Sequence, residues 1–173
     1  AVLTMRLQQA TSNPGLFVEK CPGVKFEWIK TFCKGTDEQV VVMTKFEKTA
    51  SALATYLRKE HIKCALYTGK QKATEQNTSK KAFIDKKVQV IIGTISAMGT
   101  GVDGLQVAHL GIMMERSWSP EINEQCEDRL NRRGQDAPVM WYYLNCTKSF
   151  DQHVDKVNLN KADSIRAVLE LDE

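Results

Sequence analysis

Three arginines lie close together in the stretch "QCEDRLNRRGQ", residues 125–135. On an α-helix, Gln125, Arg129 and Arg132 stand at positions i, i+4 and i+7 and therefore share one face. Arg133 points elsewhere. Two guanidinium groups on one face can clamp a phosphate through paired hydrogen bonds. The alternative is a solvated charged face, in which the arginines pair with the neighbouring acidic residues.

A second candidate stretch is "GTISAMGTGVDG", residues 93–104, which directly follows an apolar run. Its four glycines allow the backbone to approach a ligand closely or to adopt positive φ angles. Thr94 and Ser96 add hydroxyl groups that donate hydrogen bonds to phosphate. The stretch taken alone fits an ordinary flexible connection between a strand and a helix equally well.

The elements that must position these residues alternate between two hydrophobic patterns. Apolar runs that are rich in β-branched residues predict strands at 38–45, 62–69, 88–94, 108–115 and 138–145. Helical spacing predicts helices at 47–60, 73–86 and 120–133, the last beginning at Pro120. Strands that alternate with helices, and that lack a polar face, predict a mostly parallel sheet covered on both sides.

The two ends of the chain differ from this alternation. "LTMRLQQAT" and "KFEWIKTFCKG" look like helices joined by the turn-rich "SNPG", and the last residues also show helical spacing. We therefore expect an α/β domain over residues 37–147, with a helical entry segment at 1–36 and a helical extension at 148–173.

Composition narrows the function classes. The 173 residues carry a net charge of +3, which is compatible with nucleic acid without demanding it. The longest apolar runs are too short to cross a membrane. The odd number of cysteines, without a CxxC pair, predicts neither a disulfide framework nor a metal site. His61 and Cys64 have ligand-like spacing, but no second pair accompanies them. Reduced thiols fit a cytoplasmic or nuclear location.

These motifs, in this order, resemble the C-terminal RecA-like lobe of superfamily 2 helicases, and most closely that of the Swi/Snf-type DNA translocases. Residues 94–103, "TISAMGTGVD", lie along that family's Ser-Thr-Arg-Ala-Gly-Gly-x-Gly-Ile-Asn pattern. Residues 118–120 match its Trp-Asn-Pro element. "QCEDRLNRRGQ" matches Gln-Ala-x-Asp-Arg-x-x-Arg-x-Gly-Gln at every position but the Ala. The resemblance implies a RecA-like, three-layer fold.

The resemblance extends over nearly the whole chain, with departures. "LQQATSNPGLF" is similar to the family's entry segment, and Lys25 matches a lysine that usually follows it. Thr68 stands where the family has an acidic residue, Asp103 where it has Asn, and Ser119 where it has the Asn of Trp-Asn-Pro. These departures indicate a divergent member.

In this family two lobes close on one ATP molecule, so the resemblance implies a divided site. Arg129 and Arg132 would reach the phosphates as catalytic residues, one of them as an arginine finger. Gly101 and Asp103 would lie at the nucleotide, and Gln125 would orient the motif. Contacts with the phosphates of double-stranded DNA would come from Thr44, Lys45, Gly69, Lys70, Thr94 and Ser96. Trp118 would either brace the DNA side of the cleft or simply pack.

The first lobe of such a motor carries a P-loop and an acidic box, and together they bind ATP and Mg²⁺. "YTGKQ" lacks the glycine and hydroxyl positions of a P-loop, and "TDEQ" precedes a strand rather than ending one. Since the chain also opens on Ala1, we expect a piece of a longer protein that is inactive without its N-terminal lobe. A non-catalytic module that binds nucleic acid or protein, and an RNA helicase lobe, remain the alternatives.

Overall fold

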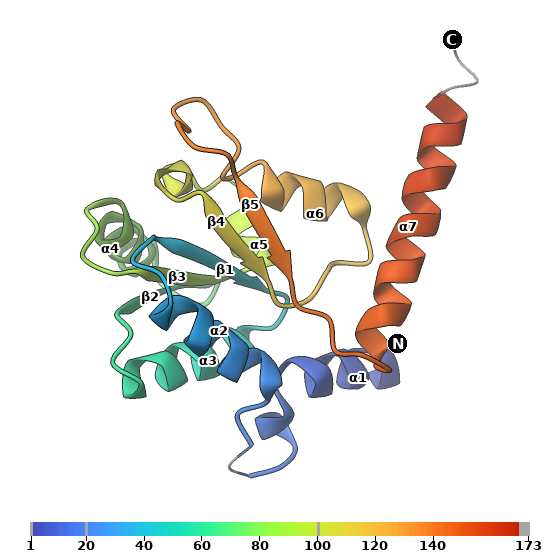
Figure 1. The fold of residues 1–173 in the computed structure, drawn as a ribbon, viewed down its shortest axis with the longest axis horizontal. Helices are drawn as coiled ribbons and strands as arrows, with labels where there is room; N and C mark the ends of the chain where they lie inside the picture. The colour runs from blue at the N-terminus through green and yellow to red at the C-terminus, as the bar shows by residue number, and fades with distance from the viewer. Residues whose placement is uncertain (1, 20, 100, 170–173) are drawn as a thin grey trace.

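The computed structural model describes residues 2–19, 21–99 and 101–169, and the side chains of all of these except 162–169. A five-stranded sheet forms its centre, in the order β2-β3-β1-β4-β5 (Figure 1). The strands are β1 (Val40–Thr44), β2 (Cys64–Tyr67), β3 (Val90–Thr94), β4 (Leu110–Met113) and β5 (Met140–Tyr143). All four pairings are parallel, so the predicted parallel sheet is confirmed.

One face of the sheet is covered by α2 (Val24–Lys34) and α3 (Glu47–Lys59). The α3 residues that helical spacing placed on one face are all buried: Ala50, Leu53, Ala54 and Leu57. Burial of each leucine contributes about 1.5–3 kcal/mol to stability. Although α2 falls within the predicted entry segment 1–36, its buried Phe26 and Ile29 make it part of this covering layer.

The other face is covered by α4 (Ala73–Ile84), α5 (Ile95–Gly99), η2 (Leu105–Val107) and α6 (Pro120–Glu127). Alternate residues of β1 point to the two faces, so Val40 and Val42 join one core and Val41 and Met43 the other. The three-layer α/β fold predicted from the sequence is therefore confirmed.

The helix predicted at 120–133 is shorter than expected, because α6 ends at Glu127. Just after α6, two backbone hydrogen bonds span three residues instead of the four of an α-helix. Arg129 N–H donates to the Cys126 carbonyl oxygen (3.1 Å), and Leu130 N–H donates to the Glu127 carbonyl oxygen (3.2 Å). Arg129 and Leu130 are consecutive residues, and both turn inward and are buried. Their tertiary contacts outweigh the local preference for helix.

The glycine-rich stretch 93–104 is not the simple loop that its composition suggested, since α5 occupies residues 95–99. Gly93 allows this helix to follow β3 directly. A Cβ at Gly93 would lie 2.1 Å from Met98 Sδ and 2.6 Å from the Tyr67 carbonyl oxygen. Only glycine therefore fits between α5 and β2.

We predict that Gly93→Ala lowers the free energy of unfolding by about 1–3 kcal/mol, because the added methyl group overpacks this junction. Urea unfolding followed by circular dichroism measures the change. Gly69→Ala is the matched control, since a Cβ there meets no atom within 4 Å. Equal stability of the two variants would contradict the packing explanation.

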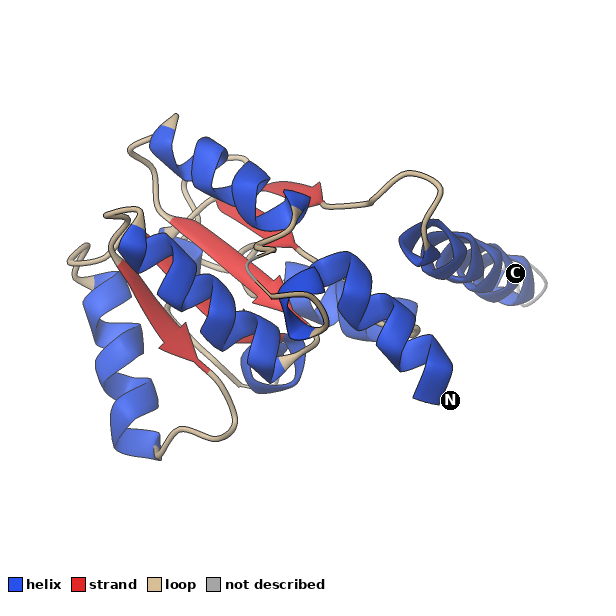
Figure 2. Ribbon diagram, turned by 90° about the horizontal axis from the view of Figure 1, so that it is seen from below, coloured by secondary structure: helices blue, strands red, loops and turns tan. Residues whose placement is uncertain are grey.

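Helices at both ends of the chain lie beyond the carboxyl ends of the strands (Figures 1 and 2). They are α1 (Val2–Ser12), followed by η1 (Pro14–Leu16), and α7 (Phe150–Leu169). These elements confirm that both ends are helical; the last four residues of the predicted extension fall outside the described chain.

A buried ion pair and the hydrogen bonds around it join the helices at the two ends of the chain to α2. Lys25 Nζ of α2 lies 2.8 Å from Asp151 Oδ2 of α7, and both side chains are almost fully buried. Thr11 of α1 donates a hydrogen bond of 2.8 Å to the other oxygen of Asp151. Lys25 also donates to the Met114 carbonyl oxygen at 2.6 Å. One carboxylate therefore links α1, α2 and α7 beside the end of β4.

Candidate nucleotide and nucleic-acid interface

The candidate nucleic-acid residues follow three adjacent strands. Thr44 and Thr94 end β1 and β3, and the parallel register pairs them directly. Gly69 and Lys70 follow β2, which lies on the other side of β3. The carboxyl ends of these strands thus bring the predicted residues to one edge of the sheet, where ligands of open parallel sheets bind.

Thr44 and Lys45 are held by a buried carboxylate that sequence reasoning missed. Glu115 Oε2 accepts hydrogen bonds from the Thr44 hydroxyl (2.7 Å) and from the Lys45 backbone N–H (2.8 Å). Burial raises the pKa of Glu115, with the positive charge of Lys25 opposing this shift. The signal in the sequence was a single carboxylate that follows the apolar run 110–114, at the end of the strand predicted at 108–115.

Lys45 has a polar environment of its own. Its ammonium donates a hydrogen bond of 3.1 Å to Gln8 Oε1 of α1. Burial lowers the pKa of Lys45, and the charge of Glu115 acts in the opposite direction. The Thr44 hydroxyl already donates to Glu115. The half-buried ammonium of Lys45 is therefore the main donor that the end of β1 offers to a phosphate.

The other predicted contacts, apart from Thr94, are more open. Gly69 and Lys70 are exposed, and Lys70 Nζ lies 3.6 Å from a Glu47 carboxylate oxygen. Thr94 is buried, and its hydroxyl oxygen accepts weak hydrogen bonds of 3.4 Å from the Ala97 N–H and the Ser96 hydroxyl. Ser96 itself is exposed at the start of α5. Exposed donors of this kind suit a flexible polyanion.

The two motifs of the candidate nucleotide site pack against each other. Arg132 forms an ion pair with Asp103, and Arg129 donates a hydrogen bond of 2.6 Å to the Gly99 carbonyl oxygen. Gly101 is exposed with a φ of +89°, and open space lies where its Cβ would be. Two contacts therefore join the glycine-rich stretch to the arginine motif.

The prediction that Arg129 and Arg132 share a helix face is wrong, because both follow the end of α6. Arg129 is only 8% exposed, whereas the Arg132 side chain is 38% exposed. Gln125 lies on α6 and is exposed, as is Arg133. Three arginines that looked alike in the sequence thus occupy different environments.

Gln135, the last residue of the motif, has a structural role that its sequence position did not reveal. Its Nε2 lies within hydrogen-bond distance of the carbonyl oxygens of Gln106 (3.1 Å) and Ala108 (2.8 Å). It also approaches the Leu130 carbonyl oxygen at 3.3 Å. This amide fastens the turn that carries Arg132 to the segment before β4.

Trp118 packs against the C-terminal helix. Its ring lies 5.7 Å from that of Phe150 and 6.0 Å from that of His153, edge to face in both cases. Lys161 of α7 donates a hydrogen bond of 2.7 Å to the Trp118 carbonyl oxygen. These contacts favour the packing role over a contact with DNA.

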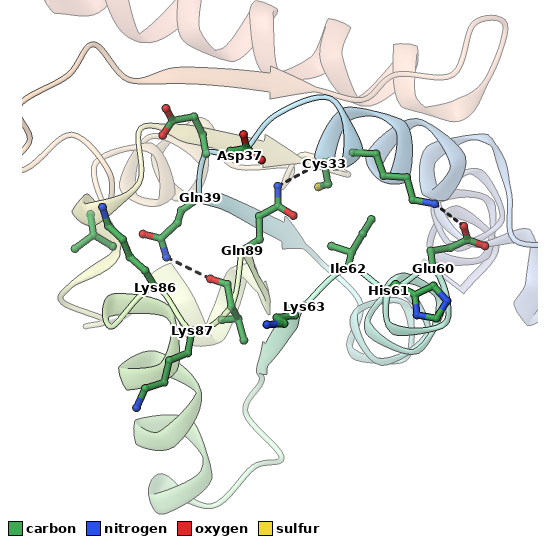
Figure 3. Close-up of a pocket in the computed structure, with 14 residues that line it drawn as sticks. Cys33, Asp37, Gln39, Glu60, His61, Ile62, Lys63, Lys86, Lys87 and Gln89 are labelled. Carbon is green, nitrogen blue, oxygen red and sulfur yellow. Dashed lines mark hydrogen bonds and ion pairs between the residues drawn. The ribbon is translucent and has the colours of Figure 1, made fainter.

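A separate hollow of about 520 Å³ lies at the opposite edge of the sheet, where the strands begin (Figure 3). Gln89 Nε2 donates to the Cys33 and Thr36 carbonyl oxygens at 2.8 and 2.6 Å, and Gln39 Nε2 to that of Phe83. These amides tie the end of α2 to the start of β3 and the end of α4 to the start of β1, so this edge has a structural role. It holds none of the candidate nucleotide or nucleic-acid residues.

Within the described residues, no group of three His, Cys, Asp or Glu side chains is placed to hold a metal ion. His61 is exposed and Cys64 is buried. Across the same part of the chain, no helix has the length and apolar character needed to cross a membrane.

The family model for the helicase conserved C-terminal domain matches residues 24–134, from α2 to the end of the arginine motif. The chain belongs to this family. Its similarities fall among Swi/Snf-type superfamily 2 helicases. The helicase domain is 28% identical over 153 residues to the uncharacterized ATP-dependent helicase C23E6.02 of Schizosaccharomyces pombe, covering 88% of this chain and 14% of that one.

A second relative supports the same assignment, and a solved structure shows the same fold. The helicase domain is 27% identical over 122 residues to the ATP-dependent DNA helicase DDM1 of Arabidopsis thaliana, covering 69% of this chain and 16% of that protein. Its fold resembles the C-terminal part of the Fun30 ATPase domain, with a TM-score of 0.73 and 20% identity. That match covers 82% of this chain and 48% of the Fun30 chain. The domain thus spans less than a fifth of the two ATP-dependent helicases.

Proposed function

We propose that this helicase C-terminal domain is the second motor lobe of an ATP-dependent DNA translocase and is inactive without an N-terminal P-loop lobe. The observation that carries the proposal is the contact between residues 93–104 and the arginine motif, made by Arg132 with Asp103 and by Arg129 with the Gly99 carbonyl. A surface with a partly exposed guanidinium and an open glycine backbone suits the phosphates of a nucleotide bound by a facing lobe.

The two arginines have different roles in this proposal. Arg132 is the arginine finger, because its guanidinium lies at the surface and is held there by Asp103. It stabilises the charge that develops on the transferred phosphoryl group. Arg129 is a positioning residue, because its hydrogen bond to the Gly99 carbonyl oxygen fixes the backbone at the end of α5.

ATP and Mg²⁺ are bound mainly by the first lobe, which supplies the phosphate-binding loop and the metal ligands. The residues of this domain fit the edge of such a nucleotide rather than its cradle. Gly101 has no atom within 4 Å of its Cβ position, and Asp103 and Gln125 are exposed. These residues line the surface that closes on the nucleotide, and Gln125 orients the motif from α6.

The nucleic acid is double-stranded DNA, bound through its phosphates by residues at the carboxyl ends of β1, β2 and β3. The contacts come from Lys45, Gly69, Lys70 and Ser96, and the buried Thr44 and Thr94 end the strands β1 and β3 that lead to two of them. Contacts with phosphates carry little sequence information and weaken as salt displaces them. Alternate opening and closing of the two lobes then moves the protein along the duplex.

The test compares ATP hydrolysis by the full-length protein with duplex DNA, with RNA of equal length and without nucleic acid. We expect stimulation by duplex DNA and no turnover by the isolated domain. Equal stimulation by RNA would favour an RNA helicase. Unstimulated hydrolysis, or turnover by the isolated domain, would overturn the proposal in favour of a module with another role.

A further inference from the structure

Gln8 is a buried polar residue outside the region matched by the helicase family. Both polar atoms of its side chain form hydrogen bonds. It is 1% exposed. Its Nε2 donates a hydrogen bond of 3.2 Å to the Arg116 carbonyl oxygen, just after β4. Its Oε1 accepts a hydrogen bond of 3.1 Å from Lys45 Nζ. The carbonyl on one side and the ammonium on the other determine the orientation of the amide.

Lys45 is therefore held at both its ends. Glu115 accepts from its backbone N–H, and Gln8 accepts from its ammonium. The ammonium also lies 5.9 Å from the centre of the Phe46 ring. Since an ammonium has three N–H donors, the bond to Gln8 leaves others for a phosphate oxygen.

Lys70 shows what an unheld lysine looks like at the same edge. Its side chain is 77% exposed, and its ammonium has a loose ion pair with Glu47 at 3.6 Å. A mobile lysine must lose rotamer freedom when it binds, which weakens the contact by about 0.5–1.5 kcal/mol, or 2–12-fold in affinity. Lys45 has already lost that freedom, because its ammonium is bonded to Gln8.

We propose that Gln8 is a positioning residue that holds the Lys45 ammonium ready for a DNA phosphate, and that α1 is thereby part of the nucleic-acid interface. The inference rests on the proposed function, because it requires Lys45 to contact phosphate. It assigns a binding role to a helix that lies outside residues 24–134.

The test uses the full-length protein and a mixed-sequence DNA duplex, with affinity measured by fluorescence anisotropy over a range of KCl concentrations. Gln8→Met keeps the side-chain length and removes the acceptor. We expect it to weaken binding about 2–12-fold. The slope of log K against log salt should stay that of the wild type, because Lys45 keeps its charge and still reaches the phosphate, whereas Lys45→Met should lower the slope by close to one.

The double variant Gln8→Met/Lys45→Met separates positioning from a general loss of folded protein. A fraction of unfolded molecules lowers the apparent affinity whether or not Lys45 is present, whereas positioning acts only through Lys45. Gln9→Met is the matched control on the same helix, since Gln9 is only half-buried and accepts from Arg6. If Gln8→Met fails to fold, Gln8→Asn keeps the amide and withdraws it from Lys45 by one methylene group.

Comparison with Lys45→Met distinguishes the possible failures. The inference predicts that the double variant loses no more affinity than Lys45→Met alone. If Lys45→Met binds like the wild type, the proposed DNA contact at Lys45 is wrong. If Lys45→Met weakens binding and Gln8→Met binds like the wild type, or if the two losses add, the role of Gln8 is wrong while the proposed function stands.

Discussion

Replacing Arg132 by alanine is expected to lower DNA-stimulated ATP hydrolysis of the full-length protein by about 10³–10⁵-fold in kcat, the usual contribution of an arginine finger. The physical reason is that a guanidinium at the closing surface stabilises charge that exists only in the transition state. Affinity for the nucleotide in its ground state should change much less. Initial-rate measurements at saturating DNA and ATP give kcat and KM separately.

Arg133→Ala is the matched control for this prediction. Arg133 is the next residue in the chain, carries the same charge and is exposed, whereas Arg132 is paired with Asp103. We expect Arg133→Ala to retain hydrolysis close to that of the wild type. Wild-type hydrolysis by Arg132→Ala, or equal losses in both variants, would contradict the assignment of the finger.

Asp151→Ala should destabilise the domain by about 3–5 kcal/mol, because it leaves Lys25 as a buried charge without its partner. Both side chains of this pair are at most 4% exposed, and the carboxylate also accepts from the Thr11 hydroxyl and the Cys146 backbone N–H. Urea unfolding of the isolated domain measures the loss. We expect it to be accompanied by loosening of α1 from α7.

Asp155→Ala provides the comparison one helical turn further along α7. Asp155 lies 3.5 Å from Arg116 and its side chain is 22% exposed, so solvent screens this pair more strongly. Its replacement should cost no more than about 1 kcal/mol. The double variant Lys25→Met/Asp151→Leu should recover part of the loss, since it removes both buried charges. Equal losses for Asp151→Ala and Asp155→Ala would contradict this explanation.

The strands of the sheet and the covering helix α3 were predictable because their hydrophobic patterns are strong and local. The run "QVVVM" has no polar side for solvent, and Ala50, Leu53, Ala54 and Leu57 repeat at helical spacing, so each element could be recognised without its neighbours. The parallel direction of the strands followed from their alternation with helices. The family assignment followed from the spacing of residues in "QCEDRLNRRGQ".

The environments of the arginines could not be predicted, because they depend on contacts between distant segments. Helical spacing treated Arg129 and Arg132 as equivalent, but the chain leaves α6 at Glu127 to bury Leu130 and to bond the Gly99 carbonyl. Such tertiary contacts outweigh a weak local helix preference.

The sequence by itself determined the strands, their parallel order and the family, all of which depend on patterns within short stretches. Only the tertiary structure decided which arginine is buried and which carboxylate holds Thr44. It also brought Gln8 to Lys45, although 37 residues separate them in the chain. The reason is that hydrogen bonds to buried groups require donors and acceptors from separate elements to meet, and no local pattern records that meeting.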